Sequence, residues 1–278
     1  MDDETLPDDG LPTSVVGDWA EEKYRLVECY ANLFATSMKN RWECRNYIDL
    51  FAGTGRAQIR GTQKIVRTAA IRALEVTAPF DRYVFCELDS TRLGALRQRV
   101  ERSHTERSVR FIEGNTNDRV DEIVAAIPLP TPGFRVLTFC FADPYQLANL
   151  QFETIRKIAS RFVDFLILIP TGMDPGRNEQ NYVAERSQVV AQFIGRENWR
   201  ESWRNERQVG FGDFVAREFG ESMRRLGYLF GGLHETHLMR NTKRKSPIYR
   251  LAMFSRNDLG EKFWRACKKV ATPQGSLF

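Results

Sequence analysis

The 278-residue chain lacks several features that would assign it to a class at once. Its five cysteines are odd in number and never form a C-x-x-C pair, which argues against a disulfide framework, a zinc site or an iron–sulfur cluster. We therefore predict no metal. No apolar run approaches the roughly 18–20 residues that cross a bilayer, and the acidic start MDDETLPDDG lacks the basic and apolar regions of a signal peptide. We expect a soluble, cytoplasmic protein with no membrane partner.

Net charge and overall composition exclude fewer classes of protein than the features above. A hydrophobic content of 42% allows a substantial core. The net charge of +5 permits an anionic partner such as DNA or RNA, but an excess of this size is also common in proteins that bind neither. Charge alone therefore does not choose between these classes.

What the chain does contain is a regular alternation of helical patterns with short apolar, β-branched runs. We predict strands at residues 47–51, 83–87, 109–112, 134–142 and 164–169, then a closing pair at 228–239 and 248–254. Helices are predicted at residues 18–38 (N-capped by Asp18), 65–76, 90–101, 118–126, 152–162, 213–226 and 258–270.

This order predicts an α/β fold: a seven-stranded mixed sheet with a closing antiparallel hairpin and helices on both faces. A polar, Arg-rich helical insertion follows strand five at about residues 173–210. We find no long linker and predict one domain over residues 1–278, with residues 1–14 flexible.

Residues 47–56 (YIDLFAGTGR) form a strand followed by a loop that contains Gly53 and Gly55. Glycines there allow close backbone approach to a nucleotide-like cofactor. A dinucleotide fingerprint would have glycine or alanine where this chain has Gln58, and no Gly-Lys-Ser/Thr is present for a P-loop. A nicotinamide-dependent oxidoreductase is thus disfavoured. The predicted cofactor-binding residues of this segment are Asp49, Phe51, Ala52, Gly53 and Gly55.

The next two strands add further candidates. Glu87 ends the apolar run RYVFCE, where its carboxylate would accept hydrogen bonds from two ribose hydroxyls, and Leu88 follows it. Asp89 or Ser90 we interpret as the cap of the following helix. After the third strand, Asn115 or Asn117 is a candidate for the adenine edge, although asparagine is also a common turn residue.

A glycine loop, an acid after strand two and a closing antiparallel hairpin together resemble class I methyltransferases, which implies S-adenosylmethionine as cofactor. The fourth strand ends in Asp143, Pro144 and Tyr145, similar to the [DNS]-P-P-[YFW] segment of amino-group methyltransferases. That resemblance implies that Asp143 accepts hydrogen bonds from the target amine while Tyr145 stacks on a flipped-out base. This chain has one proline rather than two, so Tyr145 stands one position closer to Asp143. The alternative is that Asp143 and Pro144 only begin a turn.

The combination of YIDLFAGTGR, FCELDSTRL, FADPYQ and LILIPTG with an Arg-rich insertion resembles the three-Cys-motif partner protein (TcmP) family of bacteria and phages, from about residue 24 to residue 254. Thr54 and Gln146 depart from the proline and glycine usual in that family. The resemblance implies a methyltransferase-like fold and a partner protein with three cysteines, and it implies no particular substrate.

Basic and aromatic residues supply the candidates for substrate binding. We select Arg177 in the insertion and Lys243 and Arg244 in the closing hairpin. Trp199 and Trp203 fit either a stacking wall for bases or ordinary helix packing. A further set of arginines we interpret as solvated surface: Arg92, Arg97, Arg99, Arg102, Arg107 and Arg110.

The leading hypothesis is an S-adenosylmethionine-dependent methyltransferase acting on an amino group of a nucleic acid. The alternative is a non-catalytic or weakly active interaction subunit that keeps the fold and serves a three-Cys-motif partner.

Overall fold

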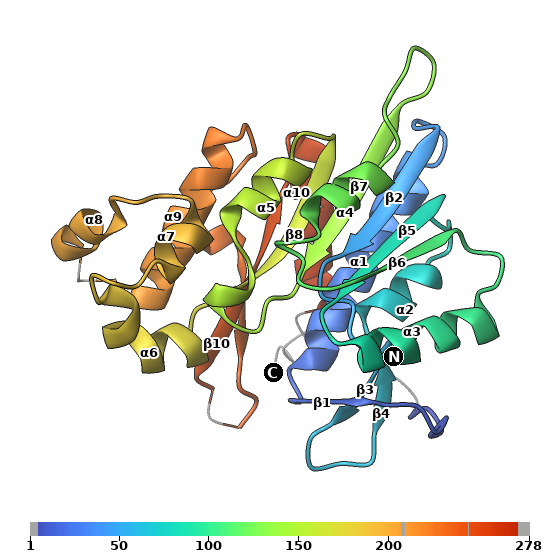
Figure 1. Ribbon diagram of the computed structural model, residues 1–278, viewed down its shortest axis with the longest axis horizontal. Coiled ribbons are helices and arrows are strands. Elements are labelled where there is room, and N and C mark those ends of the chain that lie inside the picture. Colours follow the sequence, from blue (N-terminus) through green and yellow to red (C-terminus); the bar gives the residue numbers. More distant parts are fainter. Residues whose placement is uncertain (1–4, 207–208, 244, 272–278) are drawn as a thin grey trace, which may run out of the picture.

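The protein is described from a computed structural model, over residues 5–206, 209–243 and 245–271, with the backbone alone for residues 173–177 (Figure 1). The main sheet has seven strands in the order β6-β5-β2-β7-β8-β10-β9. From one edge these are β6 (Val109–Glu113), β5 (Arg82–Glu87), β2 (Cys44–Asp49), β7 (Val136–Ala142), β8 (Val163–Pro170), β10 (Pro247–Phe254) and β9 (His237–Arg240).

The first five strands are parallel, and β10 is antiparallel to both β8 and β9. Strands β2, β7 and β8 are buried along their whole length, because they lie at the centre of the sheet with hydrophobic cores on both faces. The predicted fold class, a mixed seven-stranded sheet that closes with an antiparallel hairpin, is confirmed. It is the class I methyltransferase fold.

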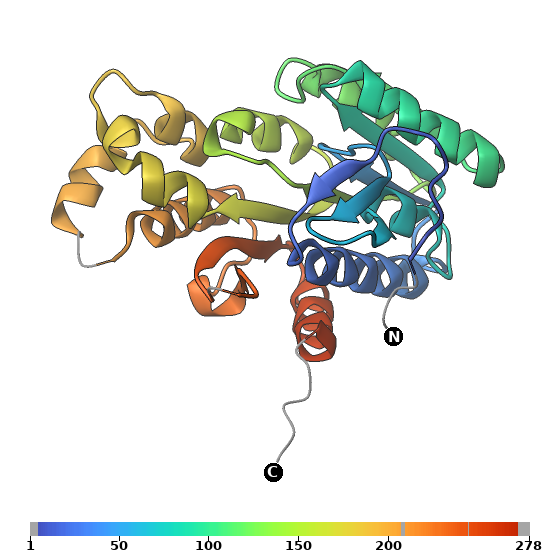
Figure 2. The same cartoon turned by 90° about the horizontal axis from the view of Figure 1, so that it is seen from below.

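Two hydrophobic cores lie on opposite faces of the sheet. One contains side chains of α1 (Ala20–Met38), α2 (Ala69–Leu74), α3 (Ser90–Ser103) and α10 (Asp258–Ala271). The other contains side chains of α4 (Val120–Ala126), α5 (Phe152–Ile158), α7 (Val189–Ile194) and α9 (Phe211–Arg225). Figure 2 shows α1 and α10 together below the sheet. None of the helices in the described ranges is both long and apolar enough to cross a membrane.

The predicted helix over residues 65–76 is wrong in its first part. Residues 56–59 and 65–67 form an antiparallel hairpin, β3 (Arg56–Ile59) and β4 (Ile65–Arg67), which β1 (Ser14–Val16) joins in a separate three-stranded sheet. Only α2 is helical. The β-branched pair Ile65 and Val66 favours the strand, and antiparallel pairing with β3 completes it.

Two other predictions are corrected. The expected strand over residues 228–239 is a strand only in β9, because Gly231 and Gly232 interrupt it before the 3₁₀ turn η2 (Leu233–Glu235). Asp18 does not cap α1: Trp19 holds the N-cap position without a side-chain hydrogen bond, and Asp18 instead accepts a hydrogen bond from the Thr242 hydroxyl.

The insertion after β8 contains α6 (Met173–Val183), α7 and α8 (Trp199–Asn205), and lies at the end of the molecule away from α3 (Figure 1). Trp199 and Trp203 are 0% and 4% exposed and pack on Phe211 and Phe214. The packing interpretation of the two tryptophans is therefore confirmed, because both rings pack in the core.

Candidate active site

The candidate active site lies where the strand order reverses. From β2 the chain winds outward to β5 and β6, then returns to place β7 on the other side of β2. Ligands of open α/β sheets bind in the crevice at such a switch point, beyond the carboxyl ends of the strands. In the registers, Asp49 lies opposite Phe85 and Phe141. The glycine loop after β2, Glu87 after β5 and Asp143 after β7 therefore meet at one edge.

Gly53 and Gly55 both adopt positive φ, +64° and +83°, which side chains other than glycine rarely tolerate. A Cβ on Gly53 would meet nothing within 4 Å, so the space on that side of the loop is open. A Cβ on Gly55 would instead lie 2.9 Å from Leu96 of α3. Gly53 thus gives a ligand access to the backbone, while Gly55 lets the loop pack against the helix behind it.

Glu87 fixes this loop. Its Oε2 accepts a hydrogen bond from the Gly53 N–H at 2.9 Å, and its Oε1 accepts one from the Asp89 N–H at 3.1 Å. A carboxylate offers about four acceptor positions, so Glu87 keeps capacity for two hydroxyl donors. Asp89 accepts from the N–H groups of Thr91 and Arg92 and caps α3, as predicted.

Leu88 is 66% exposed directly after Glu87, at the carboxyl edge of the sheet. An exposed aliphatic side chain beside a carboxylate suits a ligand that combines an apolar ring with a pair of hydroxyls. The glycine loop, Glu87 and Leu88 thus fit the adenosine part of the predicted cofactor.

Asp49 lies beneath the loop and is only 1% exposed. Its Oδ1 accepts a hydrogen bond from the Phe51 N–H at 3.1 Å, which fixes the first residue of the loop. Burial raises the pKa of Asp49 to about 8; the Phe51 N–H opposes this, and the charges of Asp143 and Glu87 add to it. Asp49 therefore carries a proton over much of the neutral range.

Lys23 is a site residue that the sequence reasoning missed. It projects from the first turns of α1, is 7% exposed, and its Nζ donates a hydrogen bond to Asp143 Oδ2. Burial is the largest single influence on the pKa of Lys23 and lowers it, but the charge and hydrogen bond of Asp143, together with Tyr24 and Tyr249, outweigh burial and hold that pKa well above its ordinary value. The sequence did contain an indication of this role. Lys23 lies on the same helix face as Val27 and Tyr30, and a lysine within an apolar helix face needs a buried acidic partner.

The residues after β7 separate into two environments. Pro144 is buried, whereas Tyr145 is 79% exposed, with Asp143 partly buried before them. The segment then enters the 3₁₀ turn η1 (Leu147–Asn149), which a reciprocal capping box between Gln146 and Asn149 begins. A carboxylate that faces inward is thus followed, two residues later, by an aromatic ring that faces outward.

Asn115 and Asn117 mainly shape the turn after β6. The Asn115 side chain accepts a hydrogen bond from the Asn117 N–H at 2.9 Å, and the Asn117 side chain bonds to Asn149, Gln151 and Thr154. The turn interpretation of Asn115 therefore describes its side-chain oxygen. The amide nitrogen of Asn115 remains the group that would meet an adenine edge.

Arg99 was expected on the solvated surface and is instead 4% exposed. One of its Nη atoms donates to the Thr54 carbonyl in the glycine loop at 2.6 Å and to the Pro12 carbonyl at 2.9 Å. Its Nε and other Nη donate to Asp9 at 2.8 and 2.7 Å. Residues 5–13, part of the segment 1–14 that was expected to be flexible, are therefore held against the glycine loop by an arginine of α3.

The predicted substrate-binding residues lie at the same carboxyl edge of the sheet or outside the described part: Tyr249 of β10 is opposite Pro170 at the end of β8, so the turn before β10 lies at that edge. Lys243 is exposed in the turn between β9 and β10. Arg244 lies outside the described residues, and at Arg177 only the backbone, within α6, is described. Lys243 is thus the one member of this set with a described side-chain position.

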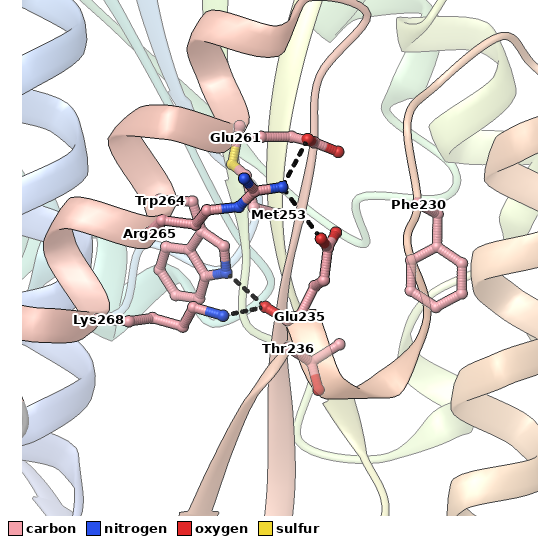
Figure 3. Close-up of a pocket in the computed structure, with 8 residues that line it drawn as sticks. All are labelled: Phe230, Glu235, Thr236, Met253, Glu261, Trp264, Arg265 and Lys268. Carbon is pink, nitrogen blue, oxygen red and sulfur yellow. Dashed lines mark hydrogen bonds and ion pairs between the residues drawn. The ribbon is translucent and has the colours of Figure 1, made fainter.

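Two hollows were found elsewhere, and neither contains a predicted site residue. The first, with a volume of about 10 Å³, lies between η2 and α10, where Figure 3 shows the Glu235 carboxylate paired with Arg265 and its carbonyl accepting from Trp264 and Lys268. That volume holds about one water molecule. The second, about 410 Å³, is lined by Glu179, Gln180, Val183, Ala184, Glu185 and Trp203 at the insertion.

The strand order, the glycine loop at the switch point and the closing antiparallel hairpin together are those of the class I methyltransferase fold. No protein-family profile matches the chain, and no curated protein matches it.

Solved structures that are similar include three methyltransferase-type or cofactor-bound proteins. The O-methyltransferase from Bacillus cereus in complex with SAH is 12% identical, with 88% of this chain and 84% of that chain covered and a TM-score of 0.47. The O-methyltransferase TomG from Streptomyces achromogenes, in complex with SAM, is 11% identical (90% and 92% covered; TM-score 0.47). Cofactor-bound Rv0187 from MTB is 13% identical (89% and 84% covered; TM-score 0.48). These similarities are distant.

Proposed function

We propose that this protein is an S-adenosylmethionine-dependent methyltransferase. The observation that carries the proposal is the meeting, at the switch point, of an open glycine loop, a carboxylate that holds the loop and a second carboxylate after the neighbouring strand. Gly53, Glu87 and Leu88 would hold the adenosine part, with Asp49 supporting the loop from below. When bound, the cofactor supplies an electrophilic methyl group on a sulfonium sulfur.

The acceptor is an amino group on a flat ring, in our proposal a nucleobase. Asp143 would accept a hydrogen bond from the amine: Lys23 engages Oδ2, so Oδ1 is the oxygen that would orient the substrate. Tyr145, with 79% of its surface exposed, would stack on the base. The contribution of both residues is alignment, since holding the nucleophile in line with the methyl group removes much of the entropic barrier.

Lys23 has a supporting role in this scheme. Its ammonium neutralises one of three carboxylates gathered at the edge and fixes the orientation of Asp143 through Oδ2. A residue that acts in this way is a positioning residue, because it touches Asp143 rather than the substrate.

We also propose, from the TcmP resemblance, that a three-Cys-motif protein is the biological partner. The alternative function, a weakly active subunit that serves this partner, is tested with the variant Asp143→Ala. Asp143→Ala should abolish methylation of single-stranded oligonucleotides while cofactor affinity stays within about threefold. Equal residual activity in wild type and Asp143→Ala would favour the interaction subunit.

Cofactor binding is tested directly by titration calorimetry with S-adenosylmethionine and S-adenosylhomocysteine. Glu87→Gln removes the charge that the loop and the ribose hydroxyls share, and charge-assisted hydrogen bonds contribute about 1.5–3 kcal/mol each, so affinity should fall roughly 10- to 100-fold. Asp89→Asn, which keeps a side-chain oxygen to cap α3, is the matched control and should bind normally. No binding by the wild-type protein would refute the proposed function.

A further inference from the structure

Two cysteines far apart in the sequence meet between helices. Cys29 lies on α1 and Cys267 on α10, helices that pack against each other below the sheet (Figure 2). Both thiols are free, and the two side chains lie close enough for each to shift the pKa of the other. Cys267 is fully buried, whereas Cys29 is partly exposed. One member of the pair is therefore accessible from solvent and the other is shielded directly behind it.

The remaining cysteines have different surroundings. Cys44, Cys86 and Cys140 are buried in the sheet; the Cys44 thiol donates to the Asn46 side chain at 3.4 Å and the Cys86 thiol to the Gly114 carbonyl at 3.5 Å. Burial raises the pKa of Cys86 to about 12 and that of Cys140 well above its ordinary value. These three thiols are protected from oxidants by burial and by protonation.

Cys29 differs in charge state as well as exposure. The hydrogen bond from the Cys267 thiol lowers the pKa of Cys29 and outweighs burial and the nearby Glu28 carboxylate. The same contact and burial raise the pKa of Cys267. The thiolate therefore forms on the accessible sulfur, with a protonated thiol beside it, which is the arrangement of an oxidisable cysteine with a resolving partner.

We propose that Cys29 and Cys267 form a reversible thiol oxidation site that responds to hydroperoxides. The Cys29 thiolate attacks the peroxide oxygen and becomes a sulfenic acid, and with one proton the leaving oxygen departs as water or an alcohol. The Cys267 thiol then displaces the sulfenic hydroxyl, which leaves as a second water, and a disulfide forms. Two electrons pass from the sulfurs to the peroxide, and a dithiol reductant reverses the step.

The consequence is a covalent link between α1 and α10. Because α1 also carries Lys23 at the candidate active site, this link would fix the helix that positions Asp143. The proposal does not depend on methyl transfer, and its test uses chemistry and mass alone.

The test treats the reduced full-length protein with stoichiometric hydrogen peroxide and then alkylates it in denaturant. All five cysteines of the reduced protein should react, against three after oxidation, with an intact mass lower by about 2 Da before alkylation. Peptide mapping should place the cross-link at Cys29 and Cys267, and dithiothreitol should restore five reactive thiols. Cys44→Ser is the matched control and should still lose two thiols on oxidation.

Two variants at one position separate reactivity from cross-linking. In native protein, Cys267→Ser keeps a hydroxyl donor to Cys29, so Cys29 should alkylate at a rate near that of wild type but form no disulfide and instead give a dimedone adduct. Cys267→Ala removes the donor, and alkylation of Cys29 should slow several-fold. The proposal fails if peroxide converts Cys29 to a sulfinic acid without a cross-link, if Cys29 joins two molecules, or if both variants oxidise as the wild type does.

Discussion

At the scale of a single residue, the buried carboxyl group of Asp49 makes the stability of the folded protein depend on pH. Its folded pKa of about 8 lies above the roughly 3.9 of an unfolded aspartate. Between about pH 4 and pH 8 the folded state therefore holds a proton that the unfolded state has released. Stability should fall as pH rises through this window and level off above it.

Asp49→Asn should remove this decline. The amide cannot ionise and its oxygen can still accept the Phe51 N–H, so the variant should exceed the wild type by a few kcal/mol near pH 8 and by little near pH 4.5. Urea unfolding over that pH range measures the difference. Asp121→Asn, on the exposed surface of α4, is the control and should retain the decline; a wild-type profile that is flat across the window would contradict the assignment.

Lys23 and Asp143 form a pair whose members depend on each other. Lys23→Met leaves Asp143 without its cation, and because Asp143 is 22% exposed we expect a loss of about 1–3 kcal/mol rather than the full cost of a buried orphan charge. Adding Asp143→Asn should recover part of this loss, which a double-mutant cycle in urea measures.

The same pair predicts a pattern of activity. Lys23→Met should reduce turnover about tenfold or more with cofactor affinity nearly unchanged, and Lys23→Arg, which keeps the charge, should restore much of it. A Lys23→Met variant with wild-type turnover would show that Lys23 serves stability alone.

At the scale of elements, the N-terminal segment depends on α3. The hydrogen bond and charge of Arg99 lower the pKa of Asp9 to about 2, although burial opposes this. Because the folded pKa lies below the unfolded value, the stability that this pair contributes is present above about pH 4 and is lost as pH falls toward 2.

Asp9→Asn should therefore be less stable than the wild type at pH 6, and the gap should close as pH falls below about 4. Proteolysis near the N-terminus should also accelerate in Asp9→Asn and in Arg99→Met, since both release residues 5–13. Glu43→Gln, whose carboxylate pairs with exposed Arg135 elsewhere, serves as the control for N-terminal cleavage.

The insertion helices depend on their aromatic contacts. Trp199→Ala should cost about 3–5 kcal/mol of folding free energy, because a fully buried indole is removed from rings of α9. Thermal unfolding measures the loss, and nucleic-acid affinity of the folded fraction should be unchanged. Weaker binding without a stability loss would instead place Trp199 in a substrate wall.

At the scale of the whole molecule, the net charge of +5 concerns the proposed nucleic-acid substrate. The logarithm of the affinity for a single-stranded oligonucleotide should fall linearly with the logarithm of the salt concentration. Lys243→Ala should reduce the slope of this line by about the amount that one phosphate contact contributes. Fluorescence anisotropy at several salt concentrations measures it. An unchanged slope would exclude Lys243 from the interface.

The sequence alone determined much of this protein. Apolar runs such as residues 134–142 and 164–169 specify buried parallel strands whatever surrounds them, and their alternation with helices specified the sheet. Gly53, Gly55, Glu87 and Asp143 were predicted as site residues because each ends or follows a strand, and the carboxyl ends of parallel strands share one edge.

Tertiary structure decided what depends on contacts between distant residues. Periodicity cannot show that Lys23 pairs with Asp143, that Arg99 holds Thr54 and Asp9, or that β1 pairs with β3. In each case the side chain or strand has no local partner, and burial requires one from another part of the chain. The sequence determined which edge of the sheet holds the glycine loop, because the order of strands and loops is local; only the packing of α1 on the sheet decided that Lys23 pairs with Asp143.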